Sequence, residues 1–480
     1  MVFLWCHYTL GDIMNSPISI KTQALNLHLR SLKFTKHKRL ACAYLALAIV
    51  PFVIAQLLGM EFTGVYSSVL GAVNLIAMMV FFMQFPLAGR LKYLPLFANI
   101  DWGITKHKQF GKYLGIFFFL HPILIVLPKG FISIDDLWLS IVSVVTSPNM
   151  LTGIIAWLTM AVWVLMSIYK DKLNLRYETW RLLHVIGFAI IATLATLHVT
   201  TIGSHGQFNH AFNITWWSLY CVSMALLIYN YFIKPRNIKK HPYAINALEK
   251  ISECDWKLSI KSKTAQSLNY QAGQFVWINT SGNPYNLEQH PFSIVTASQQ
   301  HKMISFIIRE LGDYTSSLSQ LELGATVYID GPYGNMTLEQ ANLTRGITLI
   351  AGGAGIAPIL GLLRQLAEQH DPRPIRLIYA NHTLDRMVCL YELIALEQTM
   401  VDFKLKLVCE HIENNDLLSG RHLVKGFIDL QQIAASVTTQ LETQWTFYVC
   451  GPESMLTATT GHFKQLGVAN NQIHFEQLAF

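Results

Sequence analysis

The stretch KHKQFGKYLGIFFFLHPILIVL, residues 106–127, places His107 and His121 at the two ends of a largely apolar run. The stretch RLLHVIGFAIIATLATLHVT, residues 181–200, repeats the arrangement with His184 and His198, again fourteen residues apart. Fourteen residues of an α-helix rise by about 21 Å and turn by about 1400°, so the two side chains of each pair lie about 40° apart on one helix face. Each pair would therefore reach across most of a lipid bilayer.

The composition also indicates a membrane region. Of 480 residues, 52% are hydrophobic and only 14% are charged, which is unusual for a wholly soluble protein. The net charge of +7 does not indicate a nucleic-acid partner, because the basic residues lie beside the apolar runs and not in one polar domain with surface aromatics. The seven cysteines form no CxxC pair, which argues against a disulfide or zinc framework and fits a reducing cytoplasm.

Six runs of the sequence contain no Asp, Glu, Lys or Arg, and most approach the ~20 residues that a bilayer core requires. The third run becomes long enough once its His107 end is included. The runs are residues 40–58, 65–85, 113–127, 150–169, 182–200 and 214–233. The sequence therefore predicts six transmembrane helices in a lipid bilayer.

Lysine and arginine set the expected orientation, because cytoplasmic loops near membrane spans carry the positive excess. Basic residues precede the first span, lie in the loops from the second to the third and from the fourth to the fifth span, and follow the sixth, whereas the alternate loops hold only Lys129. We therefore expect both termini, and the whole chain after residue 236, to be cytoplasmic. Residues 1–32 form an N-terminal tail without the basic start and cleavage site of a signal peptide, and we assign them no function.

The third and fifth spans run in the same direction. His107 and His184 should thus share a depth near the cytoplasmic side, and His121 and His198 a depth near the far side. Two neutral imidazoles held by rigid helices on opposite sides of an iron are the ligand set of a bis-histidine haem, so the sequence predicts two b-type haems. The alternative, histidines that only bond a neighbouring helix or mark the headgroup boundary, explains one histidine more easily than four, since ionisable groups in spans are costly and usually functional.

From about residue 240 the sequence is that of a soluble protein. Short alternating strands with Gly and Pro turns predict a small antiparallel barrel, and GITLIAGGAGIAPILGLLRQLAEQ, from residue 346, predicts a strand, a glycine turn and a helix of an α/β nucleotide-binding unit. We expect a tail (1–32), a six-span di-haem domain (33–236), an FAD-binding barrel (237–340) and an NAD(P)-binding α/β domain (341–480).

The glycine turn would let the backbone approach a pyrophosphate at a helix N-terminus. Its residues are Gly352, Gly353 and Gly355, and Pro358 suits the first turn of the helix that follows. The turn departs from GxGxxG, because Pro358 takes the place of the third glycine. A glycine turn before a helix can also serve packing alone, so its context has to supply the specificity.

That context resembles the ferric reductase and NADPH oxidase superfamily, in which a six-helix haem domain is joined to a ferredoxin-reductase-like dehydrogenase. The resemblance covers roughly residues 40–480 and rests on five motifs in the family's order: HPFSI (from 290), LGDYTSSL (from 311), GPYG (331–334), AGGAGIAPIL (from 351) and YVCGPESML (from 448). Ser293 replaces the commoner threonine and keeps the hydroxyl, whereas Ala357 replaces a frequent threonine and removes one.

The resemblance implies roles for individual residues. FAD would be held by His290, Pro291, Phe292 and Ser293, and its pyrophosphate by Gly312 and Thr315. Cys450, Gly451 and Pro452 would lie beside the nicotinamide, and the terminal Phe480 would cover the flavin ring and move for hydride transfer. The haem irons would be held by His107, His121, His184 and His198.

The expected function is electron transfer from cytoplasmic NAD(P)H through FAD and two haems to an acceptor across the membrane. Both ferric chelate and dioxygen remain possible acceptors, as does a protein electron partner. His205 and His210 of the outer loop could receive a ferric complex, or could simply be solvated. Arg386 could meet the 2′-phosphate of NADPH, or be a solvated arginine. The tip of that strand lacks an acidic residue that would bind the ribose 2′-hydroxyl of NADH.

Two other classes of protein stay open. The membrane half could be a carrier or a quinone-reactive anchor for an independent flavin reductase, but this leaves the four histidines in register unexplained. A non-enzymatic haem-binding or assembly protein would not need both nucleotide motifs and Phe480. A haem spectrum and NAD(P)H oxidation separate these alternatives.

Overall fold

The computed structural model describes residues 36–480, except 62–63, 95, 98, 205–206, 298–301, 343, 413–422, 438–443 and 478–480. The expected N-terminal tail, residues 1–32, lies outside the described residues. The described chain forms two compact units that divide between Pro235 and Arg236. Each unit is described by itself below.

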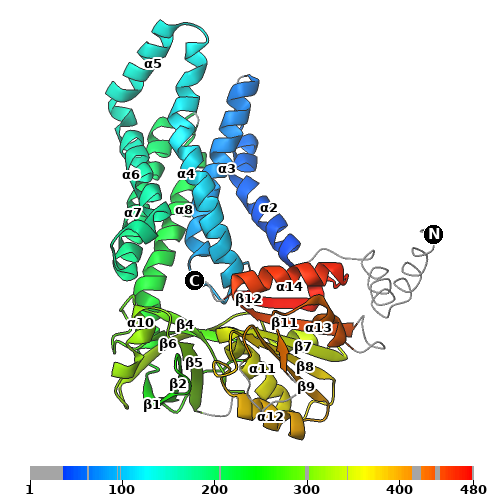
Figure 1. Ribbon diagram of the computed structural model, residues 1–480. Coiled ribbons are helices and arrows are strands. Elements are labelled where there is room, and N and C mark those ends of the chain that lie inside the picture. The colour runs from blue at the N-terminus through cyan, green and yellow to red at the C-terminus, as the bar shows by residue number, and fades with distance from the viewer. Residues whose placement is uncertain are drawn as a thin grey trace, which may run out of the picture. The chain divides into compact units, whose positions relative to one another are not determined.

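Six helices of the first unit are long and apolar enough to cross a membrane (Figure 1). They are α2 (Lys36–Leu57), α3 (Val65–Leu87), α4 (Ile100–Gly130), α6 (Leu151–Ile168), α7 (Tyr177–Ile202) and α8 (His210–Ile228). The last span continues through a π-helical segment, Tyr229–Ile233, into the short helix α9 (Lys234–Ile238). The six expected spans are confirmed, and the chain is a multi-pass membrane protein.

The third span is longer than its apolar run. The side chain of Asn99 accepts a hydrogen bond from the Trp102 backbone N–H and caps the start of α4. The helix then continues to Gly130 with Pro122 and Pro128 inside it. His107 and His121 therefore lie on one continuous helix, as expected.

One helix of this unit was not expected from the sequence. Helix α5 (Ile134–Thr146) follows α4, and the Ser133 side chain caps it by accepting from the Asp136 N–H at 2.9 Å. With 13 residues it is too short to span a bilayer. Asp135 and Asp136 in its first turn interrupt the apolar pattern that marks the spans.

Helix α6 is tied to both histidine-bearing helices. The indole N–H of Trp157 donates to the Phe119 carbonyl of α4 at 3.0 Å, and that of Trp163 donates to the Leu183 carbonyl of α7 at 2.8 Å. Because a bilayer core offers no water to indole groups, these bonds fix α6 against both helices. The buried core of the unit adds Phe81 and Trp216, whereas many other apolar side chains face outward, as lipid contact requires.

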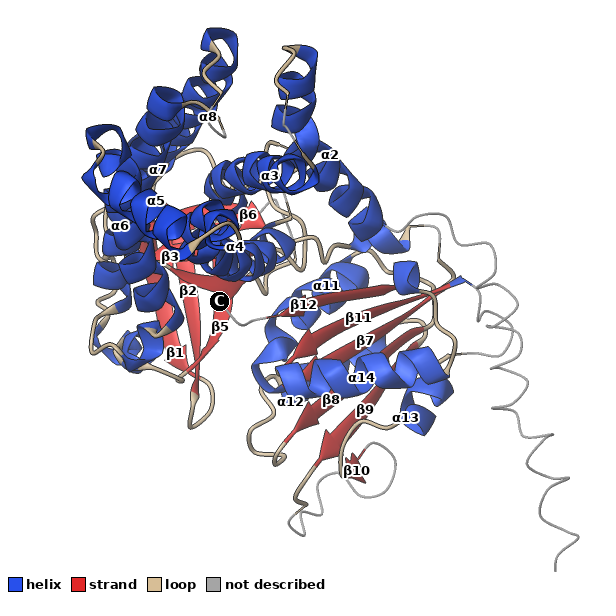
Figure 2. Ribbon diagram, turned by 90° about the horizontal axis from the view of Figure 1, so that it is seen from above, coloured by secondary structure: helices blue, strands red, loops and turns tan. Residues whose placement is uncertain are grey.

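The second unit begins with a six-stranded antiparallel sheet, seen in Figure 2, with the order β4-β3-β6-β1-β2-β5. Ile294, directly after β4, forms an antiparallel bridge with Phe306 of β5, so the two edges of the sheet meet there. The strands are β1 (Tyr243–Lys250), β2 (Asp255–Ser262), β3 (Phe275–Asn279), β4 (His290–Ser293), β5 (Met303–Arg309) and β6 (Thr326–Tyr333). The expected antiparallel sheet is present.

A parallel six-stranded sheet follows, with the order β10-β9-β8-β7-β11-β12. Its strands are β7 (Gly346–Gly352), β8 (Ile375–Asn381), β9 (Phe403–Cys409), β10 (Leu423–Lys425), β11 (Trp445–Gly451) and β12 (Ile473–Gln477). Helices α11 (Ile356–Glu368) and α12 (Leu390–Thr399) pack on one face, and α13 (Leu430–Ala435) and α14 (Glu453–Gln465) on the other. The expected α/β unit is confirmed, and the carboxyl ends of its parallel strands share one edge.

Candidate functional site

The inner histidine pair is brought together. The imidazole rings of His107 on α4 and His184 on α7 lie 6.1 Å apart between centroids, at 72° to each other. Metal–imidazole bonds are about 2 Å long, so this separation leaves room for one metal atom between a nitrogen of each ring. The geometry fits a bis-histidine ligand set.

Two of the four histidines have a side-chain partner on Nδ1. The Nδ1 of His184 lies 3.0 Å from the Ser167 hydroxyl of α6, and the Nδ1 of His121 lies 3.1 Å from the Asn74 amide oxygen of α3. The Nδ1 atoms of His107 and His198 are buried and have no hydrogen-bond partner in the part of the chain that the structure describes.

Glycine permits the close packing beside the outer histidines. A Cβ at Gly153 of α6 would lie 2.4 Å from Cε1 of His198, so no larger residue fits without moving that ring. The donor set, the two buried nitrogens without a partner and this close packing are compatible with haem ligands.

The expected flavin segment is strand β4. Its Ser293 is buried, and the Ser293 hydroxyl has no hydrogen-bond partner among the described residues. The His290 ring stacks on Tyr314 with centroids 3.7 Å apart, and Phe292 lies 6.3 Å from the same ring. Burial raises the pKa of the Tyr314 hydroxyl to about 12, so this group stays protonated and bonds the Thr280 hydroxyl. A buried hydroxyl without a partner, next to this aromatic stack, fits a site for a polar ring system.

Thr315 organises the expected pyrophosphate segment. Its hydroxyl oxygen accepts hydrogen bonds from the backbone N–H groups of Leu311 at 2.8 Å and Gly312 at 3.0 Å. The Gly312 amide is therefore already engaged within the turn, and Thr315 acts on the shape of the segment.

The two expected nicotinamide-nucleotide motifs meet at the carboxyl edge of the parallel sheet. Strands β7 and β11 are neighbours, and Ala351 is paired with Cys450. A Cβ at Gly355 would lie 2.2 Å from the Cys450 carbonyl oxygen, so only glycine allows the turn to sit this close. Pro358 lies in the first turn of α11, and Gly451 and Pro452 lead from β11 into α14.

Glu476 was not among the residues expected from the sequence. It is only 2% exposed and is paired with Cys450 across β12 and β11. A Cβ at Gly334, the end of the GPYG motif, would lie 2.9 Å from a Glu476 carboxylate oxygen. A buried carboxylate beside the expected nicotinamide cysteine is a functional-site signal that needs the strand pairing to be seen. Phe480, expected to cover the flavin, lies outside the described residues.

A buried ion pair of the antiparallel sheet lies beside the expected nucleotide turn. Arg309 of β5 donates from Nε and Nη2 to the two carboxylate oxygens of Asp255, at 2.9 and 3.1 Å, and Asp255 is 1% exposed. The remaining nitrogen, Nη1, lies 3.0 Å from where a Cβ of Gly353 would stand. This bidentate pair was also not expected from the sequence.

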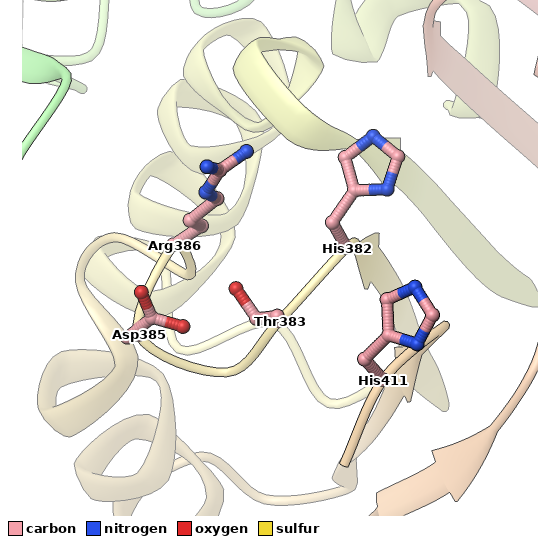
Figure 3. Close-up of a pocket in the computed structure, with 5 residues that line it drawn as sticks. All are labelled: His382, Thr383, Asp385, Arg386 and His411. Carbon is pink, nitrogen blue, oxygen red and sulfur yellow. The ribbon is translucent and has the colours of Figure 1, made fainter. Parts of the chain in front are cut away.

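A cavity of about 470 Å³ opens at the carboxyl ends of β8 and β9 (Figure 3). It is lined by His382, Thr383, Asp385, Arg386 and His411. Two acidic residues lie here: Asp385 in the lining itself, and Glu410, after the neighbouring strand β9, which pairs with Nδ1 of His382 at 2.9 Å. Of the two outer-loop histidines, His210 is exposed at the start of α8, and His205 lies outside the described residues.

Three family models match consecutive parts of the chain. Residues 68–196 match the ferric reductase like transmembrane component, residues 250–337 an FAD-binding domain and residues 349–461 an oxidoreductase NAD-binding domain. Together the three matches are those of a fusion of the ferric reductase and NADPH oxidase type. The resemblance expected from the sequence motifs is thereby confirmed.

Curated relatives of this ferric reductase-type fusion match part of it. The propane 2-monooxygenase reductase component of Mycolicibacterium smegmatis is 26% identical over 46% of this chain and 62% of its own length. Ferric reduction oxidase 8 of Arabidopsis thaliana is 26% identical over 39% of this chain and 28% of its own length. The cytochrome b5 reductase domain of Ulva prolifera nitrate reductase covers 50% of this chain at 21% identity and a TM-score of 0.44. The chain thus spans less than two thirds of the length of the first of these relatives.

Proposed function

We propose that this chain is a transmembrane NAD(P)H oxidoreductase that moves electrons from the cytoplasmic side, through FAD and two b-type haems, to an acceptor on the opposite side. The observation that carries the proposal is the facing pair His107 and His184 on two membrane spans, in a chain that also carries both nucleotide motifs. A flavin reductase with a passive anchor would leave this pair without a role.

The haem ligands are His107 and His184 on the inner side and His121 and His198 on the outer side. FAD is held by the segment from His290 to Ser293 and by the turn that Gly312 and Thr315 build. When bound, FAD accepts electrons in a pair and releases them singly, and haem iron carries them one at a time. The buried Ser293 hydroxyl supplies a hydrogen bond to the flavin, which accounts for its having no partner in the described chain.

The dinucleotide lies along the carboxyl edge of the parallel sheet. Its pyrophosphate would be held by Gly352, Gly353 and Gly355 at the N-terminus of α11, and its nicotinamide by Cys450, Gly451 and Pro452. Phe480, which lies outside the described residues, would cover the flavin until hydride transfer. Its 2′-phosphate occupies the cavity next to Arg386. We infer a preference for NADPH over NADH, because Arg386 lines the cavity and Glu410 is paired with His382, so that Asp385 is the one acidic group of the lining that would favour NADH.

The acceptor is a ferric chelate or dioxygen, reduced at the outer haem; a protein electron partner is the remaining alternative. One relative, from Arabidopsis thaliana, is named ferric reduction oxidase 8, which supports testing ferric chelate first. Both termini lie in the cytoplasm, as the lysines and arginines flanking the spans indicate.

A reoxidation experiment tests the acceptor. The purified, FAD-loaded protein is reduced with NADPH under anaerobic conditions, and ferric chelate or air is then added in separate cuvettes. Faster haem reoxidation by ferric chelate identifies a ferric reductase, whereas faster reoxidation by air with superoxide formation identifies an oxidase. Reoxidation by neither acceptor would contradict both assignments and leave the protein partner.

A further inference from the structure

The Ser167 hydroxyl has only one way to bond His184. It donates its own hydrogen to the Trp163 carbonyl, one turn earlier in α6, at 2.7 Å. The contact of 3.0 Å to Nδ1 of His184 must therefore have the serine oxygen as acceptor and the imidazole N–H as donor. This puts the proton of neutral His184 on Nδ1 and leaves the Nε2 lone pair free.

Asn74 has the same effect on His121. Its amide oxygen, which can only accept, lies 3.1 Å from Nδ1 of His121. The imidazole again carries its proton on Nδ1, so the lone pair of the neutral ring is on Nε2, the proposed ligand atom. The opposite amide orientation would place the proton on Nε2, which would block a bond to iron.

We propose that Asn74 and Ser167 are positioning residues, one for each haem. This rests on the proposed haem ligation by the four histidines. Asn74 reaches His121 of the outer pair from α3, and Ser167 reaches His184 of the inner pair from α6. Among the described residues, each pair therefore has one histidine with a side-chain partner on Nδ1 (His121 or His184) and one without such a partner (His198 or His107).

The anchors set the electronic properties of each haem separately. A hydrogen-bond acceptor on Nδ1 makes the imidazole a stronger donor through Nε2, which stabilises the oxidised iron and lowers its reduction potential. Loss of the acceptor raises that potential. Because Asn74 and Ser167 serve different pairs, each loss affects one haem.

The test uses the full-length protein with Asn74→Ala and Ser167→Ala, read by redox titration of the haem bands and by the EPR spectrum of the oxidised protein. The haem signal that disappears in the His121→Leu variant is assigned to the outer haem. We expect Asn74→Ala to raise the midpoint potential and shift the EPR signal of the outer component only, and Ser167→Ala those of the inner component only.

Matched controls lie elsewhere in the membrane unit. Ser223→Ala removes a hydroxyl bonded to the Leu219 carbonyl, and Asn230→Ala removes an amide bonded to the Leu226 carbonyl, and both should leave the two haems unchanged. If an alanine variant loses haem altogether, Ser167→Thr and Asn74→Asp, which keep an acceptor oxygen, should retain it.

Unchanged potentials and EPR signals in both alanine variants would overturn the proposal, as would haem loss that the conservative variants share. Absence of haem from the unsubstituted parent protein, which is the reference for every variant, would instead contradict the proposed function itself.

Discussion

Asn74 and Ser167 are neutral polar residues in apolar helices, and nothing in the sequence marks them as partners of histidines. Their role depends on how α3 and α6 are rotated against α4 and α7, which only the packed structure defines. His107, His121, His184 and His198, by contrast, were found from the sequence, because a titratable ring repeated at fourteen-residue spacing in two spans is conspicuous.

The proposed outer ligand is tested by His121→Leu. Removing one proposed ligand should lower the haem content from two to one per chain while FAD binding stays unchanged, because the proposed flavin residues belong to another unit. The haem-to-flavin ratio of the purified protein measures this. His210→Leu, at an exposed position that starts α8, serves as the control and should keep both haems. Two haems in His121→Leu would disprove the ligand assignment.

Arg386 is proposed to contact the 2′-phosphate of NADPH, so Arg386→Ala should lower the activity with NADPH more than the activity with NADH. A charge-assisted hydrogen bond contributes about 1.5–3 kcal/mol, so kcat/KM for NADPH should fall by about 10- to 100-fold. The value for NADH should hardly change. Arg345→Ala, which removes an exposed charge from the same domain, should affect neither. An equal loss with both nicotinamides would mean that Arg386 does not read the 2′-phosphate.

The arrangement of elements explains which parts of the site the sequence could not reveal. The six spans were predictable from apolar length alone, whereas α5 escaped notice because two aspartates break its apolar pattern and 13 residues cannot span. Glu410 follows β9, and it reaches His382, after β8, only because the two strands are parallel neighbours. Glu476 comes opposite Cys450 for the same reason. Residues that meet through sheet topology leave no local pattern.

The ion pair between β2 and β5 should stabilise the second unit. Arg309→Met leaves Asp255, which is 1% exposed, as an unpaired buried charge, and such a loss costs about 3–5 kcal/mol. Urea unfolding of the full-length protein, followed by flavin release, should therefore shift to lower urea concentration. The exposed pair Lys257 and Glu249 gives the control, since Lys257→Met should cost less than about 1 kcal/mol. Equal shifts in the two variants would contradict a stabilising role, and Arg309→Met with Asp255→Leu should recover much of the loss.

The molecule is proposed to have one orientation in the membrane, with the dehydrogenase unit on the cytoplasmic side. This orientation sets the direction of electron flow. Exposed Ile132, after α4, is expected outside, and exposed Asp171, after α6, inside. A membrane-impermeant maleimide should therefore label Ile132→Cys in intact cells above the level of the parent chain. Asp171→Cys should be labelled only after the membrane is permeabilised. The reverse pattern would place the nucleotide-binding unit on the other side.

The central claim is that one chain connects nicotinamide oxidation to two haems. Anaerobic addition of NADPH to the purified, FAD-loaded protein, with no acceptor present, tests it most directly through the haem spectrum. The account predicts reduced b-type bands that correspond to two haems per chain. Oxidation of NADPH and reduction of the flavin with the haems left oxidised, or with no haem present, would contradict it.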